Sequence, residues 1–443
     1  MSQTNELNTI ESEYDVSDIT FNSLRVWPFL RHKIFYDIYK KKYNYSAKLR
    51  VRNKFQLIRN FFRGFYKLFM LRRYDFLFFN NADKRSLING KYYDVFFDGI
   101  ADKVGQKKSC FVEWAIHKHY NSKQSHSLNI ISDLSFKLLS IIYSFFVTVD
   151  LENEEELLKI KKDYDLTFDH KKDLKRFYGE YRFYDFLFRF IRPKAIFIIC
   201  NYTKVPIVTA AKNNNVLVYE AQHGFIGKNH QFYNYHGQLP KESYPDFMLT
   251  FGNEEKDNLH DHFIFKKSEL IPVGSFYLDE IYKNYSDVEL NGYKEKFEAV
   301  FCVTLQGVHE EELLTWVAKQ ARNNKNHLYI LRPKYSGKSY KEIIDENIFL
   351  LPKYNIYQVL KYSDYNITIY STTAIEAMYF DVKTIFFNID GLSEKYFDVK
   401  KLNALVINDS DELNIEEHQI SKEYNGYFIR NYLENLENLK LSI

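Results

Sequence analysis

The sequence predicts an α/β protein of two domains in series, each built on a parallel sheet. Three observations predict this class. The chain has 443 residues, more than a single core of ordinary size holds. Apolar strand-like runs alternate with helical patterns between 195 and 274, and the alternation restarts at 299. Polar residues follow several strands at their ends, where open α/β sheets bind ligands. We therefore expect two parallel sheets facing an interdomain cleft.

The composition argues against several classes of protein. Charged residues make up 27% of the chain but the formal net charge is only +3, which gives no case for a nucleic-acid binder. Cys110, Cys200 and Cys302 lie far apart, which argues against a disulfide framework or a zinc site and fits a reducing compartment. The N-terminus is unlike a signal peptide, and the longest uncharged run of membrane-like composition, Leu138–Val149, is too short to span a bilayer. We expect a cytoplasmic protein without transmembrane helices.

The first expected element is helical and covers residues 16–73. Between Asp37 and Asp75 there is no acidic residue, whereas twelve basic residues lie between Lys40 and Arg73. Apolar side chains recur at helical spacing beside a basic stripe: Phe55, Ile58, Phe62, Phe65 and Phe69 beside Arg59, Arg63 and Lys67. The pattern predicts a basic amphipathic helix. It either packs on its domain with a solvated basic face or contacts an anionic membrane surface, and nucleic acid is a less favoured partner.

Three strands are expected next, at 75–79, 93–97 and 110–112, and helices follow over 128–190. Asp98 and Asp102 come directly after the second of these strands. Carboxylates at a strand end are candidates for a general base, although most Asp-Gly pairs simply form turns.

The most informative stretch of the first half follows a strand at 216–219. A strand at 195–200, ended by Asn201 and Tyr202, and a short helix at 205–213 lead to it. Polar and flexible residues then gather in one loop: Glu220, Gln222, His223, Gly224 and His230. An imidazole can take a proton from an attacking hydroxyl, and Glu220 could orient His223 or pair with a substrate. A structural histidine bonded to the backbone is the alternative.

The second half repeats the strand and helix rhythm. Strands at 245–251 and 269–274 complete the first half, and 275–293 is expected to be a linker. Further strands are expected at 299–305, 327–331, 366–370 and 383–388, with helices at 309–322, 355–362 and 373–380. We therefore expect an N-terminal domain over 1–285 and a C-terminal domain over 286–443.

Three strand ends of the second half carry residues suited to phosphate. Ser371, Thr372 and Thr373 follow one strand and begin a helix, whose free amides and nearby hydroxyls favour an anion. Glu376 has capping-box spacing from Thr373, so an ordinary capped helix is the alternative. A second strand end carries two cations, Arg332 and Lys334. The third strand end carries the flexible pair Gln306-Gly307. Together they favour a nucleotide mono- or diphosphate site.

Several catalytic motifs are missing from the sequence. There is no GxxxxGK[ST] and no GxGxxG, so ATP hydrolysis and dinucleotide binding lack their signals. There is also no GxSxG, no HExxH and no cluster of metal ligands. We therefore expect no cofactor and no metal.

The layout resembles that of the bacterial GT-B glycosyltransferases of surface polysaccharide synthesis and, more distantly, the teichoic-acid polyol-phosphate transferases. The matching residues are the Gln222-His223-Gly224 loop, the Arg332-Pro333 pair, and the turn with Ser371, Thr372, Thr373 and Glu376. The resemblance covers roughly 193–390. Lys334 stands where polyol-phosphate transferases usually carry histidine, which makes a CDP-polyol donor less favoured than a sugar donor.

The resemblance implies a division of roles between two GT-B-like, Rossmann-like domains. The donor nucleotide would lie on the C-terminal domain, with phosphate at Ser371–Thr373 and its charge offset by Arg332 and Lys334. Glu376 would hold the ribose or the cap, and Gln306 would lie beside the donor. The acceptor would enter from the N-terminal domain, with His223 as base, Glu220 and Gln222 beside it, and an acceptor side formed by Gly224, His230, Tyr202 and Asp98.

These observations lead to one functional hypothesis. The protein would be a metal-independent glycosyltransferase that moves a sugar from a nucleotide-activated donor to a capsule-type or lipopolysaccharide-type glycan or a lipid-linked acceptor. It would be cytoplasmic and peripheral to the membrane, which it would contact through Lys40–Arg73. The alternatives are a CDP-polyol-type polyol-phosphate transferase, a sugar-nucleotide epimerase, and a non-catalytic glycan-binding protein of the same shape.

Overall fold

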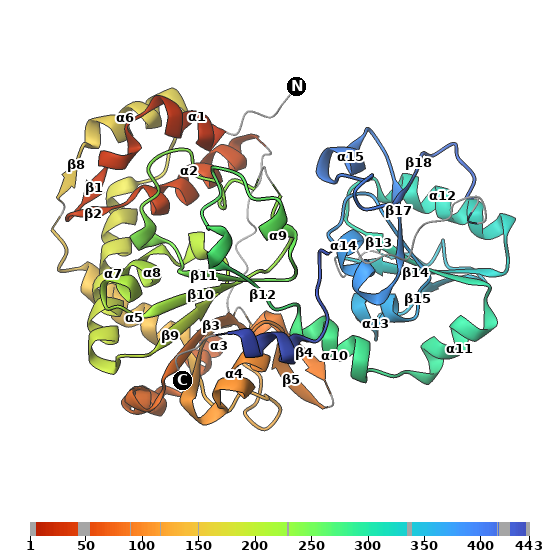
Figure 1. Cartoon of the computed structure of the whole chain (residues 1–443), viewed down its shortest axis with the longest axis horizontal. Helices are drawn as coiled ribbons and strands as arrows, with labels where there is room; N and C mark the ends of the chain where they lie inside the picture. Colours follow the sequence, from red (N-terminus) through yellow and green to blue (C-terminus); the bar gives the residue numbers. More distant parts are fainter. Residues whose placement is uncertain are drawn as a thin grey trace. The chain divides into compact units, whose positions relative to one another are not determined.

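The fold was obtained as a computed structural model and forms two compact units (Figure 1). The first unit comprises Met1–Thr250, Glu255–Val273 and Leu433–Ile443, and the second comprises Phe251–Glu254 and Gly274–Tyr432. The structure describes residues 6–42, 54–88, 90–115, 117–148, 150–227, 230–334, 339–413, 415 and 426–439.

The first unit is organised around a parallel sheet of seven strands. In spatial order they are β12 (Leu270–Pro272), β11 (Phe247–Thr250), β10 (Leu217–Ala221), β9 (Ala195–Ile198), β3 (Phe76–Asn81), β6 (Ser109–Trp114) and β7 (Ile130–Ser132). Of these seven strands, β3, β6 and β7 come first in the chain and run from the middle of the sheet to one edge. The later strands, β9 to β12, run from the middle to the other edge. The winding therefore reverses between β3 and β9, as in doubly wound Rossmann-like sheets.

Helices cover this sheet (Figure 1), and its strands are buried on both faces. The sequences of these strands are therefore nearly continuous apolar runs. The helices here are α4 (Asp98–Val104), α5 (Asp133–Ser144), α6 (Glu154–Asp163), α7 (His170–Ile191), α8 (Val205–Asn213) and α9 (Glu254–Asp257), and among them α5 and α8 contact strands of the sheet. α5 packs on α7, and α7 packs on α8. Gly179 of α7 allows the closest approach, because a Cβ atom at this position would lie 2.6 Å from Cβ of Ser144.

The second unit has a parallel sheet of six strands. Their order is β15 (Ile348–Leu350), β14 (His327–Pro333), β13 (Ala299–Leu305), β16 (Tyr365–Thr368), β17 (Lys383–Phe387) and β18 (Leu405–Ile407). The winding reverses between β13 and β16. The surrounding helices are α10 (Phe276–Asn284), α11 (Val288–Lys296), α12 (Glu310–Asn323), α13 (Ile356–Lys361), α14 (Thr373–Glu376), the 3₁₀ turn η8 (Ala377–Phe380) and α15 (Leu392–Tyr396). The predicted α/β class with two Rossmann-like parallel sheets is confirmed.

Three element predictions need correction, besides the helical range 128–190, which also contains β7 of the main sheet. The segment 16–73 is not uniformly helical: it contains β1 (Thr20–Phe21), β2 (Leu24–Arg25), α2 (Trp27–Lys42), α3 (Lys54–Phe61) and the 3₁₀ segment η2 (Phe65–Arg73), and 43–53 lie outside the described residues. β1 pairs with β2 and with β8 (Leu151–Glu152). The expected linker 275–293 instead forms α10 and most of α11.

The predicted strand at 93–97 is the third correction. The chain forms a hairpin there, β4 (Arg85–Ile88) with β5 (Lys91–Asp94), which stands apart from the main sheet. Oδ1 of Asp94 accepts hydrogen bonds from the backbone N–H groups of Phe96 and Phe97, at 3.0 and 2.8 Å. This side-chain turn ends the strand at Asp94 and starts α4 at Asp98.

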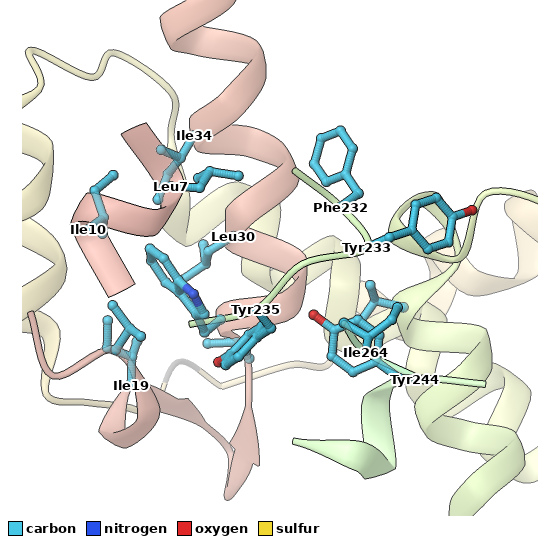
Figure 2. Packing of buried hydrophobic residues seen from close by; sticks show 14 of the residues in the cluster. Leu7, Ile10, Ile19, Leu30, Ile34, Phe232, Tyr233, Tyr235, Tyr244 and Ile264 are labelled. Atoms are coloured by element: carbon cyan, nitrogen blue, oxygen red, sulfur yellow. The ribbon is translucent and has the colours of Figure 1, made fainter. Parts of the chain in front are cut away.

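The N-terminal helices pack on the segment that carries His230 (Figure 2). Leu7 and Ile10 of α1 (Glu6–Glu13) and Leu30 of α2 belong to the same buried cluster as Tyr233 and Tyr235. A buried polar core joins the same parts. Arg31 pairs with Glu11 and donates to the carbonyl oxygens of Gln231 (3.0 Å) and Asn234 (2.6 Å). Glu11 also accepts the backbone N–H of His236 at 2.9 Å. The segment that contains α1 and α2 therefore holds the loop after β10 in place.

The described part of the chain holds no helix that combines the length and the apolar character needed to cross a bilayer.

Candidate functional site

Glu220 is the central polar residue of the first unit's candidate site. It lies on β10, in register with Ile198 of β9 and Met248 of β11, and its side chain is fully buried. Cys200, just beyond β9, adopts a left-handed conformation with φ 54°. This turn brings the next residue to Glu220: the backbone N–H of Asn201 donates to Oε1 at 3.0 Å and Nδ2 donates to Oε2 at 2.8 Å.

A third donor, the hydroxyl of Tyr233, reaches Oε1 of Glu220 at 2.6 Å. Burial raises the pKa of Glu220 to about 7, against the opposing effect of the hydrogen bonds from Tyr233 and Asn201. The carboxyl group is therefore poised between its two protonation states at neutral pH. Its hydrogen bonds run to Asn201 and Tyr233, so the expected role of orienting His223 finds no support in this geometry.

His223 and His230 present two imidazoles beyond the end of β10. Burial lowers the pKa of each to about 4, and for His223 the neighbouring His230 and Lys84 lower it further. Both rings are therefore neutral at neutral pH. Within the described residues, Nδ1 of each ring is buried and has no hydrogen-bond partner. An unpartnered nitrogen on a neutral imidazole can accept a proton or a hydrogen bond from a hydroxyl.

Aromatic rings surround these imidazoles. The ring of Tyr202 stacks on Phe232 with centroids 4.2 Å apart and lies 6.5 Å from the ring of His223. His32 of α2 contacts both Tyr202 (5.5 Å) and Phe232 (5.6 Å). His230 meets Tyr233 edge to face, with ring centroids 4.8 Å apart. The predicted residues His223, His230 and Tyr202 therefore lie in one cluster, and no pattern in the sequence indicates that His32 joins them.

Gln222 shapes the same loop from inside. Its Nε2 donates to the carbonyl oxygen of Gly224 at 3.0 Å and to Oε1 of Glu255 at 2.5 Å. The backbone N–H of Gln222 continues the sheet by donating to Leu249 at 2.9 Å. A Cβ atom at Gly224 would meet no atom within 4 Å, so the glycine leaves open space on this side of the loop.

Asp98 lies in a different place, where β3 and β6 end. Its carboxylate accepts the backbone N–H of Asp94 at 2.7 Å and the hydroxyl of Ser127 at 2.7 Å, and it pairs with Arg85 at 3.4 Å. Arg85 also pairs with Glu113, which in turn bonds His119 at 2.7 Å. Asp98 is fully buried in this network. None of these contacts involves His223, and they are the contacts of a structural carboxylate; an acceptor-side role for Asp98 stays a prediction.

In the second unit, polar side chains meet at the point where the winding reverses. The hydroxyl of Thr304 donates to Oδ1 of Asn366 at 3.0 Å and accepts from the hydroxyl of Thr373 at 3.3 Å. Beyond them, Oε1 of Gln306 accepts the backbone N–H of Tyr370 at 3.1 Å. These bonds tie the carboxyl ends of β13 and β16 together. This edge is where doubly wound sheets bind their ligands.

The serine and threonine turn differs from the predicted capping box. The backbone N–H of Thr373 donates to Oγ of Ser371 at 3.3 Å, and Thr372 makes no side-chain cap bond. Glu376 instead accepts the hydroxyl of Tyr357 at 2.9 Å. α14 has only four residues, so its dipole is small, and an anion here would depend on the hydroxyls and on nearby cations.

Arg332 brings a cation to the strand next to this group. It lies in register with Thr304 on the neighbouring strand, and Nη1 donates to the carbonyl oxygen of Leu351 at 2.7 Å. Its Nε is buried without a partner among the described residues, as is Nδ2 of Asn366. Lys334 is exposed, and its backbone N–H donates to Leu305 at 3.1 Å. This edge of the second unit's sheet thus holds hydrogen-bond donors that have no partner among the described residues. An oxyanion ligand needs such donors.

Sequence reasoning missed Thr304, Asn366 and Glu255. Thr304 and Asn366 are polar residues inside strands that are otherwise apolar, and a polar side chain at a buried strand position is a signal that could have found them. Glu255 belongs to the segment after β11, far from Gln222 in sequence. Among the described residues, no group of three or more His, Cys, Asp and Glu side chains could hold a metal ion.

Comparison with known proteins adds evidence on the fold. No protein-family model matches the chain, and no curated protein matches it. Among solved structures, UDP-GlcNAc 2-epimerase from Neisseria meningitidis bound to UDP-GlcNAc is similar, with 11% identity and a TM-score of 0.50 over 83% of this chain and 99% of that chain. A UDP-N-acetylglucosamine 2-epimerase gives 11% and 0.48 over 82% and 94%, and the calicheamicin glycosyltransferase CalG4 gives 11% and 0.42 over 79% and 88%.

At such identities the similarity concerns the fold alone. Two observations define the class of fold: the winding reverses in both sheets, and the Neisseria structure is similar in fold. The chain has a GT-B-like fold of two Rossmann-like units.

Proposed function

We propose that this protein is a glycosyltransferase that moves a sugar from a nucleotide-activated donor to a growing surface polysaccharide or a lipid-linked glycan. The observation that carries the proposal is the edge of the second sheet, where Arg332, Thr304 and Asn366 converge at the reversal of the winding. The resemblance to surface-polysaccharide glycosyltransferases, in the motifs at His223, Arg332 and Ser371, favours sugar transfer among the reactions that such a fold supports.

The donor would bind through its phosphates at this edge. The unpartnered Nε of Arg332 and the hydroxyls of Ser371 and Thr373 would contact phosphate oxygens, with Lys334 nearby in the chain to offset charge. Gln306 and Glu376 would hold the nucleoside side of the donor. No catalytic metal is part of this proposal.

The acceptor would bind on the first unit. A hydroxyl of the acceptor would donate its proton to the neutral imidazole of His223 while its oxygen attacks the anomeric carbon, and the nucleotide would leave with the electron pair of the broken bond. His230 and Tyr202 would line the acceptor side, with the loop set by Gln222 and Gly224. Glu220, fixed by Asn201 and Tyr233, would act as a positioning residue for the loop.

The setting proposed for this reaction is the inner face of the plasma membrane, where lipid-linked glycans are built. The basic segment Lys40–Arg73, of which 43–53 lie outside the described residues, would favour anionic lipid. Capsule and lipopolysaccharide glycans are the product classes that we propose.

Nucleotide binding measured by calorimetry tests the donor site. UDP-GlcNAc is the first probe, because a structure of the same fold was solved with it bound, and CMP, CDP, UDP and GDP follow. Arg332→Ala should weaken binding about tenfold or more, since a charge-assisted hydrogen bond contributes roughly 1.5–3 kcal/mol. Arg322→Ala, on the exposed face of α12 in the same unit, is the matched control and should bind as the wild type does. Equal affinities for the Arg332 variant and the wild type would remove Arg332 from the donor site.

The other candidates differ in their products. A sugar-nucleotide epimerase converts its substrate without an acceptor, and a CDP-polyol transferase releases CMP. A non-catalytic glycan-binding protein of this shape would bind no nucleotide in the calorimetric screen.

A further inference from the structure

Large apolar side chains project into solvent from three neighbouring helical elements of the first unit. Phe55 of α3 is 83% exposed and Phe69 of η2 is 85% exposed. Phe145 and Phe146, directly after α5, are 80% and 84% exposed. Single exposed hydrophobic residues are normal on proteins, but a contiguous group of aromatic ones marks an interaction surface.

The three elements lie side by side. The hydroxyl of Ser135, in the first turn of α5, donates to the carbonyl oxygen of Phe61 at the end of α3, at 2.9 Å. At the end of α7, Arg72 of η2 lies 3.7 Å over the ring of Phe190 and donates to its carbonyl oxygen at 3.2 Å. We call the exposed side chains of α3, η2, α5 and the end of α7 the α3–α5–α7 surface.

The outer face of α5 connects the parts of this surface. Leu138, Leu139, Ile141 and Ile142 are exposed along it, and Phe145 and Phe146 follow at its end. From Leu138 onward α5 carries no charged residue. Its twelve residues are about 18 Å long, too short to cross a bilayer but long enough to lie in the interface.

The charges around this apolar face are positive. From Lys54 to Arg73 the chain has six basic residues and no acidic one. On α7, Arg182 and Arg189 are exposed next to the exposed ring of Phe186. The acidic residue at the start of α5, Asp133, is buried and paired with Lys137. Aromatic residues with cations beside them complement an anionic lipid headgroup layer, and the nearest exposed acid after α5 is Asp150, four residues beyond Phe146.

We propose that the α3–α5–α7 surface docks on an anionic bilayer, with the end of α5 inserted among the headgroups and the cations of α3, η2 and α7 on lipid phosphates. A second copy of the chain is the other occupant that an apolar face suggests. Two such faces would place the cations of Lys54–Arg73 against one another without acidic partners, which opposes self-association. The proposal deepens the contact with anionic lipid proposed above for Lys40–Arg73. It concerns a surface apart from the loop of His223 and does not depend on the proposed reaction.

Vesicle flotation of the full chain tests it. Wild-type protein should float with vesicles that contain phosphatidylglycerol, bind phosphatidylcholine vesicles much more weakly, and lose binding as salt is added. The double variant Phe145→Ser, Phe146→Ser should lower the partition coefficient about tenfold or more, because two inserted rings are lost. Arg72→Ala with Arg73→Ala should lower it about fivefold per charge on the anionic vesicles only.

Matched controls distinguish docking through this surface from non-specific binding to vesicles. Val288→Ser removes an apolar side chain that is 92% exposed in the second unit, and Lys107→Ala removes an exposed charge elsewhere in the first unit. Neither should change flotation. Circular dichroism and the melting temperature should be the same in the wild type and in all variants, which shows that a loss of flotation is not a loss of fold.

Three results would overturn the proposal. One is wild-type protein that stays unbound to phosphatidylglycerol vesicles. Another is a phenylalanine double variant that floats as well as the wild type. The third is a wild-type dimer by light scattering that becomes monomeric in that variant, which would assign the surface to a second copy.

Discussion

At the residue scale, two opposing effects set the protonation state of the buried carboxyl group of Glu220. Three donors from Asn201 and Tyr233 stabilise its charged form, while complete burial stabilises the neutral form. Burial prevails, and the pKa of Glu220 rises to about 7. The loop that carries His223 thus rests on a group whose charge changes near neutral pH.

The stability of the protein should reflect this titration. The pKa of Glu220 is higher in the folded state than the ordinary value of 4.5, so the folded state holds a proton that the unfolded state releases. This contribution is complete below pH of about 4.5 and is lost as the pH rises through about 7. Glu220→Gln removes it. The stability of the wild type relative to Glu220→Gln should therefore fall over this range, by on the order of 3 kcal/mol.

Thermal denaturation of both proteins across this pH range provides the measurement. Tyr233→Phe is the companion variant: it removes a hydrogen bond that lowers the pKa of Glu220, so its loss of stability should be shifted to higher pH. Parallel curves for the wild type and Glu220→Gln would show that Glu220 does not titrate as described.

At the residue scale the sequence allowed part of the site to be predicted. Polar residues next to apolar strands, such as His223 and Ser371, can be recognised because the end of a strand is visible in the chain. The partners of Glu220 could not be predicted in the same way, because Asn201 reaches it only through the left-handed turn at Cys200. Asp98 shows the reverse: its type and position suggested catalysis, but its burial with Arg85 depends on a hairpin that the apolar pattern did not indicate.

At the scale of elements, the junction between α3 and η2 depends on one glycine. Gly64 has φ +69°, and a Cβ atom there would lie 2.0 Å from the carbonyl oxygen of Ile130 on β7. The chain therefore passes directly against the edge strand of the sheet, and the backbone N–H of Ser132 donates to Arg63 at 3.0 Å.

Gly64→Ala should consequently be much more destabilising than an ordinary glycine substitution. The left-handed conformation costs about 1–2 kcal/mol for alanine, and the contact with Ile130 adds a cost that only a backbone shift can relieve. Gly90→Ala is the matched control, because Gly90 has φ +81° and open space around it. The drop in melting temperature should be clearly larger for Gly64→Ala. Equal drops for the two variants would show that the contact with Ile130 is unimportant.

Most strands of both sheets were predictable because parallel strands covered on both faces are apolar throughout, as at Ala299–Leu305. The short strands β7, β15 and β18, of three residues each, were not predicted. The segments 16–73 and 275–293 were predicted less well. Their helices alternate with short strands, 3₁₀ turns and loops whose ends depend on tertiary contacts such as those of Arg31 and Glu11.

At the scale of the whole molecule, each unit has its own parallel sheet and its own reversal of the winding. The repetition of the strand and helix pattern predicted this organisation. The return of the last residues was not predictable: Leu433–Ile443 belong to the first unit, where Leu436 is buried and Nδ2 of Asn435 donates to Val273 at 3.2 Å. The cleft expected between the domains stays a prediction.

The central claim is that the protein transfers a sugar to an acceptor, and His223 is the residue assigned to the chemistry. If its neutral imidazole accepts the proton of the acceptor hydroxyl, His223→Ala should lower turnover on the order of 10²-fold or more while leaving the affinity for the nucleotide unchanged. Arg332→Ala should instead act mainly on nucleotide affinity.

The most direct measurement is nucleotide release from a labelled nucleotide sugar, with and without a lipid-linked glycan acceptor, together with the fate of the label. The account predicts nucleotide release that requires the acceptor, label transferred to the glycan, and loss of both in His223→Ala. Conversion of the nucleotide sugar into an isomer without an acceptor, or wild-type turnover in His223→Ala, would contradict it.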